Sequence, residues 1–455
     1  MNKSNMEDDI YISLIFRNKS SESIRFIQSL LELIRKEGVK SRKSNLLKAL
    51  PCIAVGLLRA KASSKTEHAY RPMSTASFTG ESIGHMPFKA AIDGLVSAGH
   101  ITFVNALKPA VDSIFNPAMA SRFQGKSKFF ELAAAYGIKP EEWDQHFEAL
   151  PMPRVIHNPI ILRTDSPLVA VGKRRKIKKP SENMRVDPAD PFVIEESRRI
   201  NEINAFLSHQ DIQPAYLVQG FQRIFSNGNL PGFNWNAGGR LYAIGGGYQQ
   251  EPGSERLKMT INAEPVVEID IRASHLTILH ALKGVPLPSG DPYDIPGIPR
   301  LVVKSWVAMT LGHDKLPGNK WSVAAKNTYA KKACGFRNEN DEQEELCRTV
   351  CKGRCLQQLY PMAKTGPQIA CYFPILDDWA ASPHRWEKFQ YLESQAIIDA
   401  VHTLAIHHGV PSLPVHDSII VPVSKQEVAE RMLSDAFYKH VRVMPVLSVK
   451  PNASI

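Results

Sequence analysis

The sequence lacks the long apolar run that a membrane-spanning helix needs. Across 455 residues, no stretch approaches the roughly 20 consecutive apolar residues that cross a bilayer. The N-terminal segment MNKSNMEDDIYISLIF is acidic early on and lacks the apolar core of a signal peptide. We therefore expect no membrane partner and a cytoplasmic location.

Cysteine is scarce, and four of the six residues lie close together: Cys334, Cys347, Cys351 and Cys355. In a reducing compartment they are expected to be thiols or metal ligands, not disulfides. The last three recur every four residues, so on a helix they span two turns, too long for three thiolates to meet one tetrahedral zinc ion. The spacing favours a buried stripe of small apolar residues.

Several other patterns are also missing. The sequence contains no P-loop, no dinucleotide-binding fingerprint and no internal repeat. Its expected strands and helices follow one another without a βαβ rhythm, which predicts the α+β class. The net charge of +11 favours polyanionic partners such as nucleic acid.

The N-terminal part divides into two expected regions. Residues 1–62 are predicted to be helical, with a helix from Ser21 to Glu37, a stop at Gly38, and an apolar stripe of Ile24, Ile27, Leu30, Leu31 and Ile34. Residues 63–163 contain an amphipathic helix, HMPFKAAIDGLVSAGH, followed by the short strand ITFV. This order is typical of a winged-helix DNA-binding module, and another small helical domain is the alternative.

A strongly basic segment follows at residues 164–192. It holds six Lys or Arg residues within Lys173–Lys179, beginning with Lys173, Arg174 and Arg175, and then becomes proline-rich and polar. The composition predicts a solvated linker. An arm that contacts phosphate groups is the functional alternative.

Residues 193–455 are predicted to form the main α+β domain. We expect helices over Glu195–Leu207, Ser274–Leu282, Arg300–Leu311 and Gln390–His408. Val266–Ile271 is an expected strand, and Leu413–Val423 an expected strand–turn–strand. Ser424 to Glu427 has the pattern of a capping box that opens a last helix.

Two aspartates lie at the ends of expected strands. Asp270 ends the strand in VVEIDIRASH, and Asp417 occupies the turn in SLPVHDSIIVPV. Two carboxylates that neighbouring strands bring together repel each other, and divalent cations relieve this repulsion. Two Mg²⁺ ions, or Mn²⁺ in their place, would then form the clamp used for phosphoryl transfer, about 4 Å apart. Mg²⁺ needs few protein ligands because it also takes water and substrate phosphates.

Basic and polar residues accompany the aspartates. Arg300 and Lys304 are four residues apart and share a helix face, from which they can reach a triphosphate. In FNWNAGGRLYAIGGGYQQ, glycines flank Arg240 and Tyr242 and would let the backbone approach a ligand closely. Arg240, Tyr242 and Gln249 offer charge, stacking and hydrogen bonding to a nucleic acid.

In their order, these motifs resemble the palm and fingers of phage-type single-subunit RNA polymerases and, more distantly, of family A DNA polymerases. GGRLYA is similar to the Arg-Gly-Arg-Val-Tyr-Ala element of that family, and the helix YLESQAIIDAVHTLAIHHGV is similar to the one before its second catalytic motif. The resemblance covers residues 220–440. It implies that Asp270 and Asp417 are catalytic and bind metal, that Arg300 and Lys304 bind the incoming nucleoside triphosphate, and that His416 lies against nucleic acid.

The sequence departs from this family at the expected sugar site. His275 stands five residues after the first aspartate, where family A DNA polymerases carry a glutamate that blocks the 2′-hydroxyl and the RNA polymerases a glycine. A bulky histidine favours deoxynucleotides. Glu393 falls where the RNA polymerases keep a histidine that reads the ribose, so direct acceptance of a 2′-hydroxyl by Glu393 is the alternative.

Two further departures concern the fingers. Gly312 and His313 replace the expected Tyr-Gly, and the region between the aspartates is short. The sequence therefore predicts a right-hand polymerase palm with reduced fingers that copies a DNA template from nucleoside triphosphates. An RNA polymerase or primase-like enzyme is one alternative, and a nucleic-acid-binding replication or regulatory protein with an inactive palm is the other.

Overall fold

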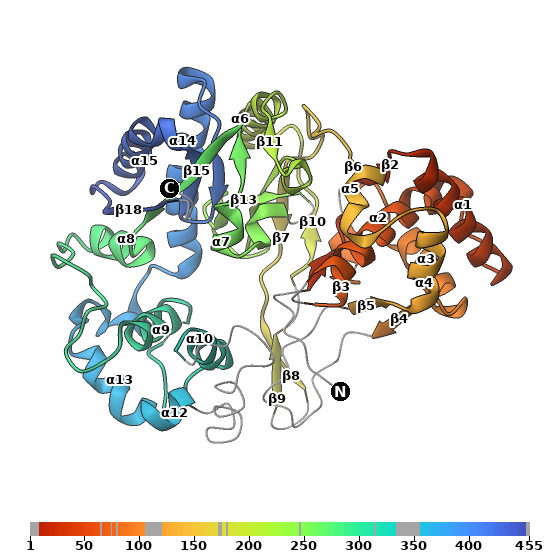
Figure 1. Ribbon diagram of the computed structural model, residues 1–455. Coiled ribbons are helices and arrows are strands. Elements are labelled where there is room, and N and C mark those ends of the chain that lie inside the picture. Colours follow the sequence, from red (N-terminus) through yellow and green to blue (C-terminus); the bar gives the residue numbers. More distant parts are fainter. Residues whose placement is uncertain are drawn as a thin grey trace. The chain divides into compact units, whose positions relative to one another are not determined.

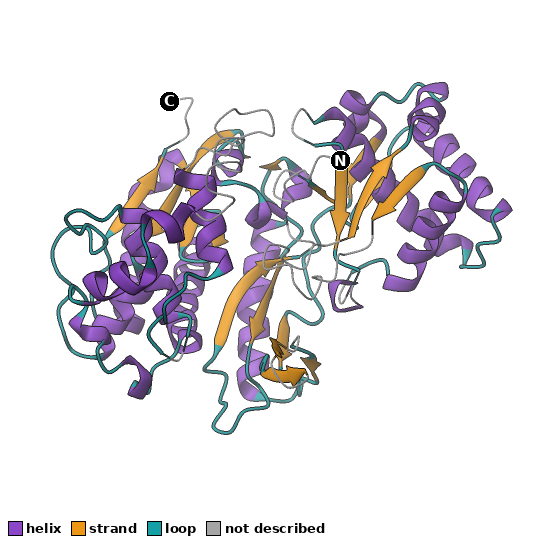
Figure 2. Cartoon of the chain, turned by 90° about the horizontal axis from the view of Figure 1, so that it is seen from below, coloured by secondary structure: helices purple, strands orange, loops and turns teal. Residues whose placement is uncertain are grey.

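The computed structural model describes residues 9–63, 66–73, 75–78, 81–104, 121–171, 175–178, 181–244, 247–313, 315–333 and 355–451. The chain divides into two compact units (Figure 1). Unit 1 comprises Met1–Asn158, Leu207–Gln222 and Tyr242–Ala263, and unit 2 comprises Pro159–Phe206, Arg223–Leu241 and Glu264–Ile455. Both helices and strands make up the molecule, which is therefore of mixed α+β class (Figure 2).

Unit 1 combines a small mixed sheet with helices. The sheet has the order β1-β3-β5-β4, and β1 pairs with β3 in parallel while the other pairs are antiparallel. Its elements are β1 (Ile10–Tyr11), β2 (Phe16–Asn18), α1 (Ser21–Lys36), α2 (Lys43–Ala62), β3 (His68–Arg71), α3 (His85–Ser97), β4 (Ile101–Val104), β5 (Ser121–Gly125), α4 (Ser127–Ala135), α5 (Trp143–His146), β6 (Phe147–Ala149), β11 (Ile212–Gln213), α7 (Gly253–Arg256) and β14 (Thr260–Ile261).

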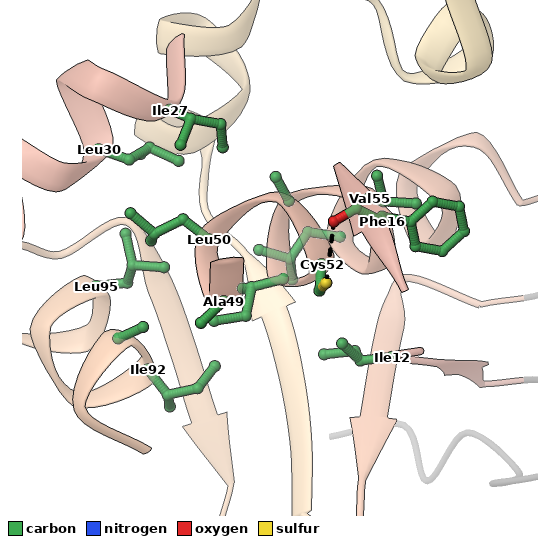
Figure 3. Close-up of a cluster of buried hydrophobic side chains, with 14 of the residues drawn as sticks. Ile12, Phe16, Ile27, Leu30, Ala49, Leu50, Cys52, Val55, Ile92 and Leu95 are labelled. Carbon is green, nitrogen blue, oxygen red and sulfur yellow. Dashed lines mark hydrogen bonds between the residues drawn. The ribbon is translucent and has the colours of Figure 1, made fainter. Parts of the chain in front are cut away.

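Helix α2 lies at the centre of the unit 1 core. Nearly all of its length from Leu46 to Ala60 is buried, and side chains of α1 and α3 pack around it (Figure 3). The Cys52 thiol is fully buried and donates to the carbonyl of Phe16 at 3.4 Å. Burial raises the pKa of Cys52 to about 12, which makes it an unreactive core thiol. The boundary expected between residues 62 and 63 falls inside this shared core, because α2 packs against strand and helix residues on both sides of it.

Local signals set the helix ends in unit 1. The Ser20 hydroxyl accepts from the N–H of Ser23 at 3.1 Å and caps α1, which ends before Gly38 at a φ of +84°. The expected apolar stripe was wrong at Ile24, whose side chain is 45% exposed. Phe26 packs in the core instead, because the buried face of α1 follows the 3.6-residue period from Ser23 onward. The helix and strand expected over HMPFKAAIDGLVSAGHITFV are confirmed as α3 and β4.

Unit 2 carries an antiparallel sheet in the order β18-β15-β17-β16. Helix α14 packs against α15 and α8, and α9 contacts α10 and α13 (Figure 1). The elements are β7 (Ile160–Arg163), β8 (Leu168–Val171), β9 (Arg175–Lys178), β10 (Asn183–Met184), α6 (Pro191–Leu207), most of β12 (Phe221–Phe225) and of β13 (Gly238–Ala243), β15 (Glu264–Ile271), α8 (Ser274–Leu282), α9 (Arg300–Leu311), α10 (Val323–Ala333), α12 (Cys355–Leu359), α13 (Met362–Ala370), α14 (Trp386–His408), β16 (Leu413–Val415), β17 (Ser418–Pro422), α15 (Gln426–Val441) and β18 (Leu447–Lys450).

One expectation for unit 2 needs correction, and the structure adds detail to another. In the basic segment, β8 and β9 pair antiparallel. The capping box at Ser424 does not form: its N–H and hydroxyl donate to Glu264 at 2.5 and 2.9 Å, and α15 begins two residues later without a side-chain cap. A carboxylate on the neighbouring strand β15 thus replaces the local partner that the sequence offered.

Two further expectations concern the cysteines and membrane-spanning helices, and part of the first falls outside the described residues. Cys334, Cys347 and Cys351 lie outside them, and Cys355 begins α12. Among the helices that the structure describes, none is both long and apolar enough to cross a membrane.

Candidate active site

Pairing of β15 with β17 brings together the two predicted catalytic aspartates, Asp270 near the end of β15 and Asp417 in the turn that precedes β17. In the antiparallel register Asp270 lies opposite Ser418, so Asp417 is one residue beyond its partner. The N–H of Ile271 donates to the Asp417 carbonyl at 3.0 Å, which fixes the turn against β15. His416 sits exposed in that turn with a φ of +53°. Pairing of the strands therefore brings two distant motifs to one end of the sheet.

Asp417 lies in an environment that disfavours its charge. Burial, followed by the negative charges of Glu393 and Asp270, raises the pKa of Asp417 to about 7. The two predicted metal ligands are thus within electrostatic reach of each other, and a third carboxylate from α14 joins them. Such a site gains stability when a cation approaches.

Glu393 is the buried centre of a polar cluster whose charge acts on Asp417. Its Oε1 accepts from Arg240 of β13, with Nε at 2.9 Å, and its Oε2 accepts from the Ser274 hydroxyl at 2.7 Å. Although burial favours the neutral acid, His275, Arg240 and the Ser274 hydroxyl together lower the pKa of Glu393. A charged carboxylate that accepts three hydrogen bonds therefore links α14 to β13 and α8.

His275 stands beside this carboxylate but does not share its hydrogen bonds. Its Nε2 atom lies 3.5 Å from Glu393 Oε2, is buried, and makes no hydrogen bond to any residue that the structure describes. The other side of this contact is the carboxylate oxygen that accepts from the Ser274 hydroxyl. Burial lowers the pKa of His275, so its ring is neutral at pH 7.

A lysine from the C-terminal strand contacts the first aspartate. Lys450 of β18 places its Nζ atom 3.1 Å from Asp270 Oδ2 and 2.9 Å from the buried Glu268. Burial acts to lower the pKa of Lys450, but the hydrogen bond to Glu268 and the charge of Asp270 raise it overall. The amine is therefore charged, and it holds one oxygen of Asp270.

The predicted nucleotide-binding pair lies on α9. Arg300 is the first residue of the helix, and Lys304 is exposed one turn later. The Arg300 guanidinium donates to both oxygens of Asp291 and lies 5.3 Å from the centre of the Tyr293 ring. Burial raises the pKa of Tyr293 to about 12, and the charges of Asp291 and Asp417 act in the same direction.

The other predicted nucleic-acid contacts are scattered. Tyr242 and Gln249 belong to unit 1, where the Gln249 amide oxygen accepts from the N–H of Ala243 at 2.9 Å and closes its own loop. Lys173 and Arg174 lie outside the described residues. Arg175 begins β9. The contact of these residues with nucleic acid stays a prediction.

The metal-binding role of Asp270 and Asp417 stays a prediction. Among the described residues, no group of three His, Cys, Asp or Glu side chains is arranged to hold a metal ion. Mg²⁺ commonly uses one or two carboxylates together with substrate phosphates, so the pair Asp270 and Asp417 is a sufficient donor set. The raised pKa of Asp417 is the feature that such an ion would relieve.

Sequence reasoning missed several residues of this site: Ser274, Asp291, Tyr293 and Lys450. Ser274 could have been found, because it stands within the first aspartate motif and begins α8. Asp291 lies in a Pro- and Gly-rich loop that gives only a turn signal. The contact of Lys450 with Asp270 depends on the pairing of β18 with β15, which no local sequence pattern predicts.

Comparison with known proteins places few constraints on this chain. No known protein family matches the sequence, and no curated protein matches it. Among solved structures, the chain is similar to the POL domain of Pol1 from M. smegmatis in complex with DNA primer-template and dNTP, at 14% identity and a TM-score of 0.23. The match covers 46% of this chain and 45% of that one.

Proposed function

We propose that the protein catalyses template-directed nucleotidyl transfer, with a preference for deoxynucleotides. The observation that carries this proposal is the pair Asp270, on β15, and Asp417, in the turn before the adjacent strand β17, with the Asp417 pKa raised to about 7 by burial and neighbouring carboxylates. Carboxylates kept together despite their repulsion are expected where a cation and a charged substrate complete the site.

The residues around the pair suit a nucleoside triphosphate. Mg²⁺ bound by Asp270 and Asp417 would supply neutralisation of phosphate charge and activation of the attacking hydroxyl. Arg300 and Lys304 would hold the triphosphate, Arg300 as a planar fork and Lys304 as a point charge. Arg240 keeps Glu393 ionised beneath the site.

The sugar preference follows from the cluster around Glu393. Both of its oxygens already accept hydrogen bonds, from Arg240 and from Ser274. A ribose 2′-hydroxyl would therefore have to compete for this carboxylate. The His275 ring beside it fills space with a neutral, bulky group, which favours exclusion of the hydroxyl over its recognition.

Extension of a labelled primer on a DNA template tests the function. The wild-type protein with Mg²⁺ should extend the primer with deoxynucleotides, and Asp417→Asn should abolish extension while leaving the fold and DNA binding largely intact. Extension with ribonucleotides alone, or synthesis without primer, would show an RNA polymerase or primase-like enzyme. DNA binding without any extension would show an inactive palm.

A further inference from the structure

The loop before α9 holds an aspartate against two arginines. Asp291 accepts from Arg300, with Nη2 to Oδ1 at 3.4 Å and a shorter contact from Nε to Oδ2. The Nη2 atom of Arg272, which directly follows β15, lies 3.8 Å from Asp291 Oδ2. The Asp291 carboxylate thus contacts two guanidinium groups, that of Arg300 on α9 and that of Arg272 just after β15.

The carboxylate is positioned by its own backbone. Its Oδ1 accepts from the N–H of Tyr293 at 3.1 Å, and the Asp291 carbonyl accepts from the N–H of Asp294 at 3.0 Å. The Tyr293 side chain is buried and anchors this turn. The hydrogen bond from Arg300 lowers the pKa of Asp291, so an anion stands beside Arg300 at neutral pH.

We propose that Asp291 is a placeholder anion that occupies the triphosphate-binding arginine Arg300 until a nucleotide displaces it. This inference rests on the proposed triphosphate role of Arg300. The guanidinium geometry that receives a carboxylate also receives a phosphate in bidentate fashion, so the two anions compete for one fork. Asp291 thereby weakens nucleotide binding and sets which phosphate chains are retained.

The expected size of the effect follows from exposure. The Arg300 side chain is 52% exposed, so its pair with Asp291 is that of a surface ion pair. Loss of the competing carboxylate should tighten triphosphate binding about two- to fivefold, which corresponds to ~0.4–1 kcal/mol at 1.4 kcal/mol per tenfold.

The test compares Asp291→Asn with Asp294→Asn in the full chain. Asparagine keeps the side-chain oxygen that accepts from Tyr293 but removes the charge that holds Arg300. Asp294 is exposed in the same loop and provides a matched loss of one negative charge. Calorimetry with inorganic tripolyphosphate and with dATP, each with Mg²⁺, measures binding without requiring synthesis, and primer extension gives KM and kcat.

Asp291→Asn should lower the Kd for tripolyphosphate and the KM for dATP, with a smaller change in kcat, while Asp294→Asn changes neither beyond the general charge effect. In an Arg300→Gln background, Asp291→Asn should have no effect on binding. Equal effects of the two aspartate variants, weaker binding by Asp291→Asn, or persistence of its effect without Arg300 would overturn the inference. Tighter tripolyphosphate binding in a protein that extends no primer would leave this inference standing and refute the proposed function.

Discussion

At the scale of single residues, burial and neighbouring charges strongly change the pKa of the Asp417 carboxyl group. Its pKa rises from 3.8 to about 7 because of burial and the charges of Glu393 and Asp270. The folded protein therefore binds a proton here that the unfolded chain has already released between these two pH values. Stability from this group is complete below pH 4 and is lost as the pH rises towards 7.

Replacement of Asp417 with the neutral, similarly sized asparagine should remove this loss of stability at rising pH. In the presence of EDTA, the free energy of unfolding of the wild type should fall relative to that of Asp417→Asn between pH 4 and 7, by about 1.4 kcal/mol for each unit of pKa shift. Urea unfolding at several pH values measures it. Asp435→Asn, at an exposed position of α15, is the control and should follow the wild type. Parallel curves for wild type and Asp417→Asn would contradict the assigned shift.

His275 is the residue on which the proposed sugar preference depends. Its buried ring lies 3.5 Å from the Glu393 carboxylate, whose oxygens already accept three hydrogen bonds. His275→Gly should open space for a 2′-hydroxyl and raise ribonucleotide use relative to deoxynucleotide use, by about tenfold if the ring removes ~1.4 kcal/mol of ribonucleotide binding. Competition between dATP and ATP in primer extension measures this ratio.

Glu393→Gln serves as the comparison for His275→Gly. It keeps the size of the side chain but weakens its contacts with Arg240 and Ser274. If the wild type already prefers ribonucleotides and Glu393→Gln removes that preference, the carboxylate reads the ribose and His275 is not a gate.

At the scale of elements, strand β13 packs closely against β12 at Gly239, the residue before Arg240. Gly239 has a φ of +79°, and a Cβ atom there would lie 2.9 Å from the Phe225 ring and 3.1 Å from the Arg223 guanidinium. Arg223 is fully buried, pairs with Glu196 and donates to the Gly239 carbonyl at 2.7 Å, so it cannot move aside. Gly239 of GGRLYA thus permits the close packing of β13 on β12.

Gly239→Ala should therefore destabilise the protein more than a glycine substitution that adds only backbone strain. Gly284 is the matched control, because it has a φ of +65° and nothing within 4 Å of an added Cβ atom. Both alanine variants carry the cost of a left-handed residue, and Gly239→Ala adds overpacking of about 1–3 kcal/mol. Equal losses in urea unfolding would show that the strands separate easily at this point.

The elements of the candidate site were largely predictable, whereas their contacts were not. The expected ranges Ser274–Leu282 and Arg300–Leu311 match α8 and α9, because apolar periodicity and neighbouring turn residues act locally. The contact of Lys450 with Asp270 joins residues 180 positions apart. It follows from strand pairing, which depends on the whole sheet.

At the scale of the whole molecule, unit 1 is assembled from three separated stretches of chain. Composition and periodicity describe residues that are neighbours in sequence. They therefore predict contiguous regions and cannot predict a unit built from separate stretches. Net charge is a property that does transfer from sequence to molecule. The chain carries +11, and six Lys or Arg residues fall within Lys173–Lys179. Within this segment β9 pairs antiparallel with β8.

Binding to DNA should be largely electrostatic, with the basic segment as a main contributor. Replacement of Lys173, Arg174 and Arg175 together with glutamine should weaken binding to duplex DNA and reduce the slope of log K against log salt by about 0.9 for each phosphate that the variant no longer neutralises. Fluorescence anisotropy over a range of salt concentrations gives both values. The matched control removes three exposed charges elsewhere in unit 2, at Lys425, Arg431 and Arg442. If the control reduces the slope as much, the basic segment has no special role and the whole basic surface binds. A wild-type affinity that does not change with salt would instead show that DNA is not held through its phosphates, because release of counterions requires that dependence.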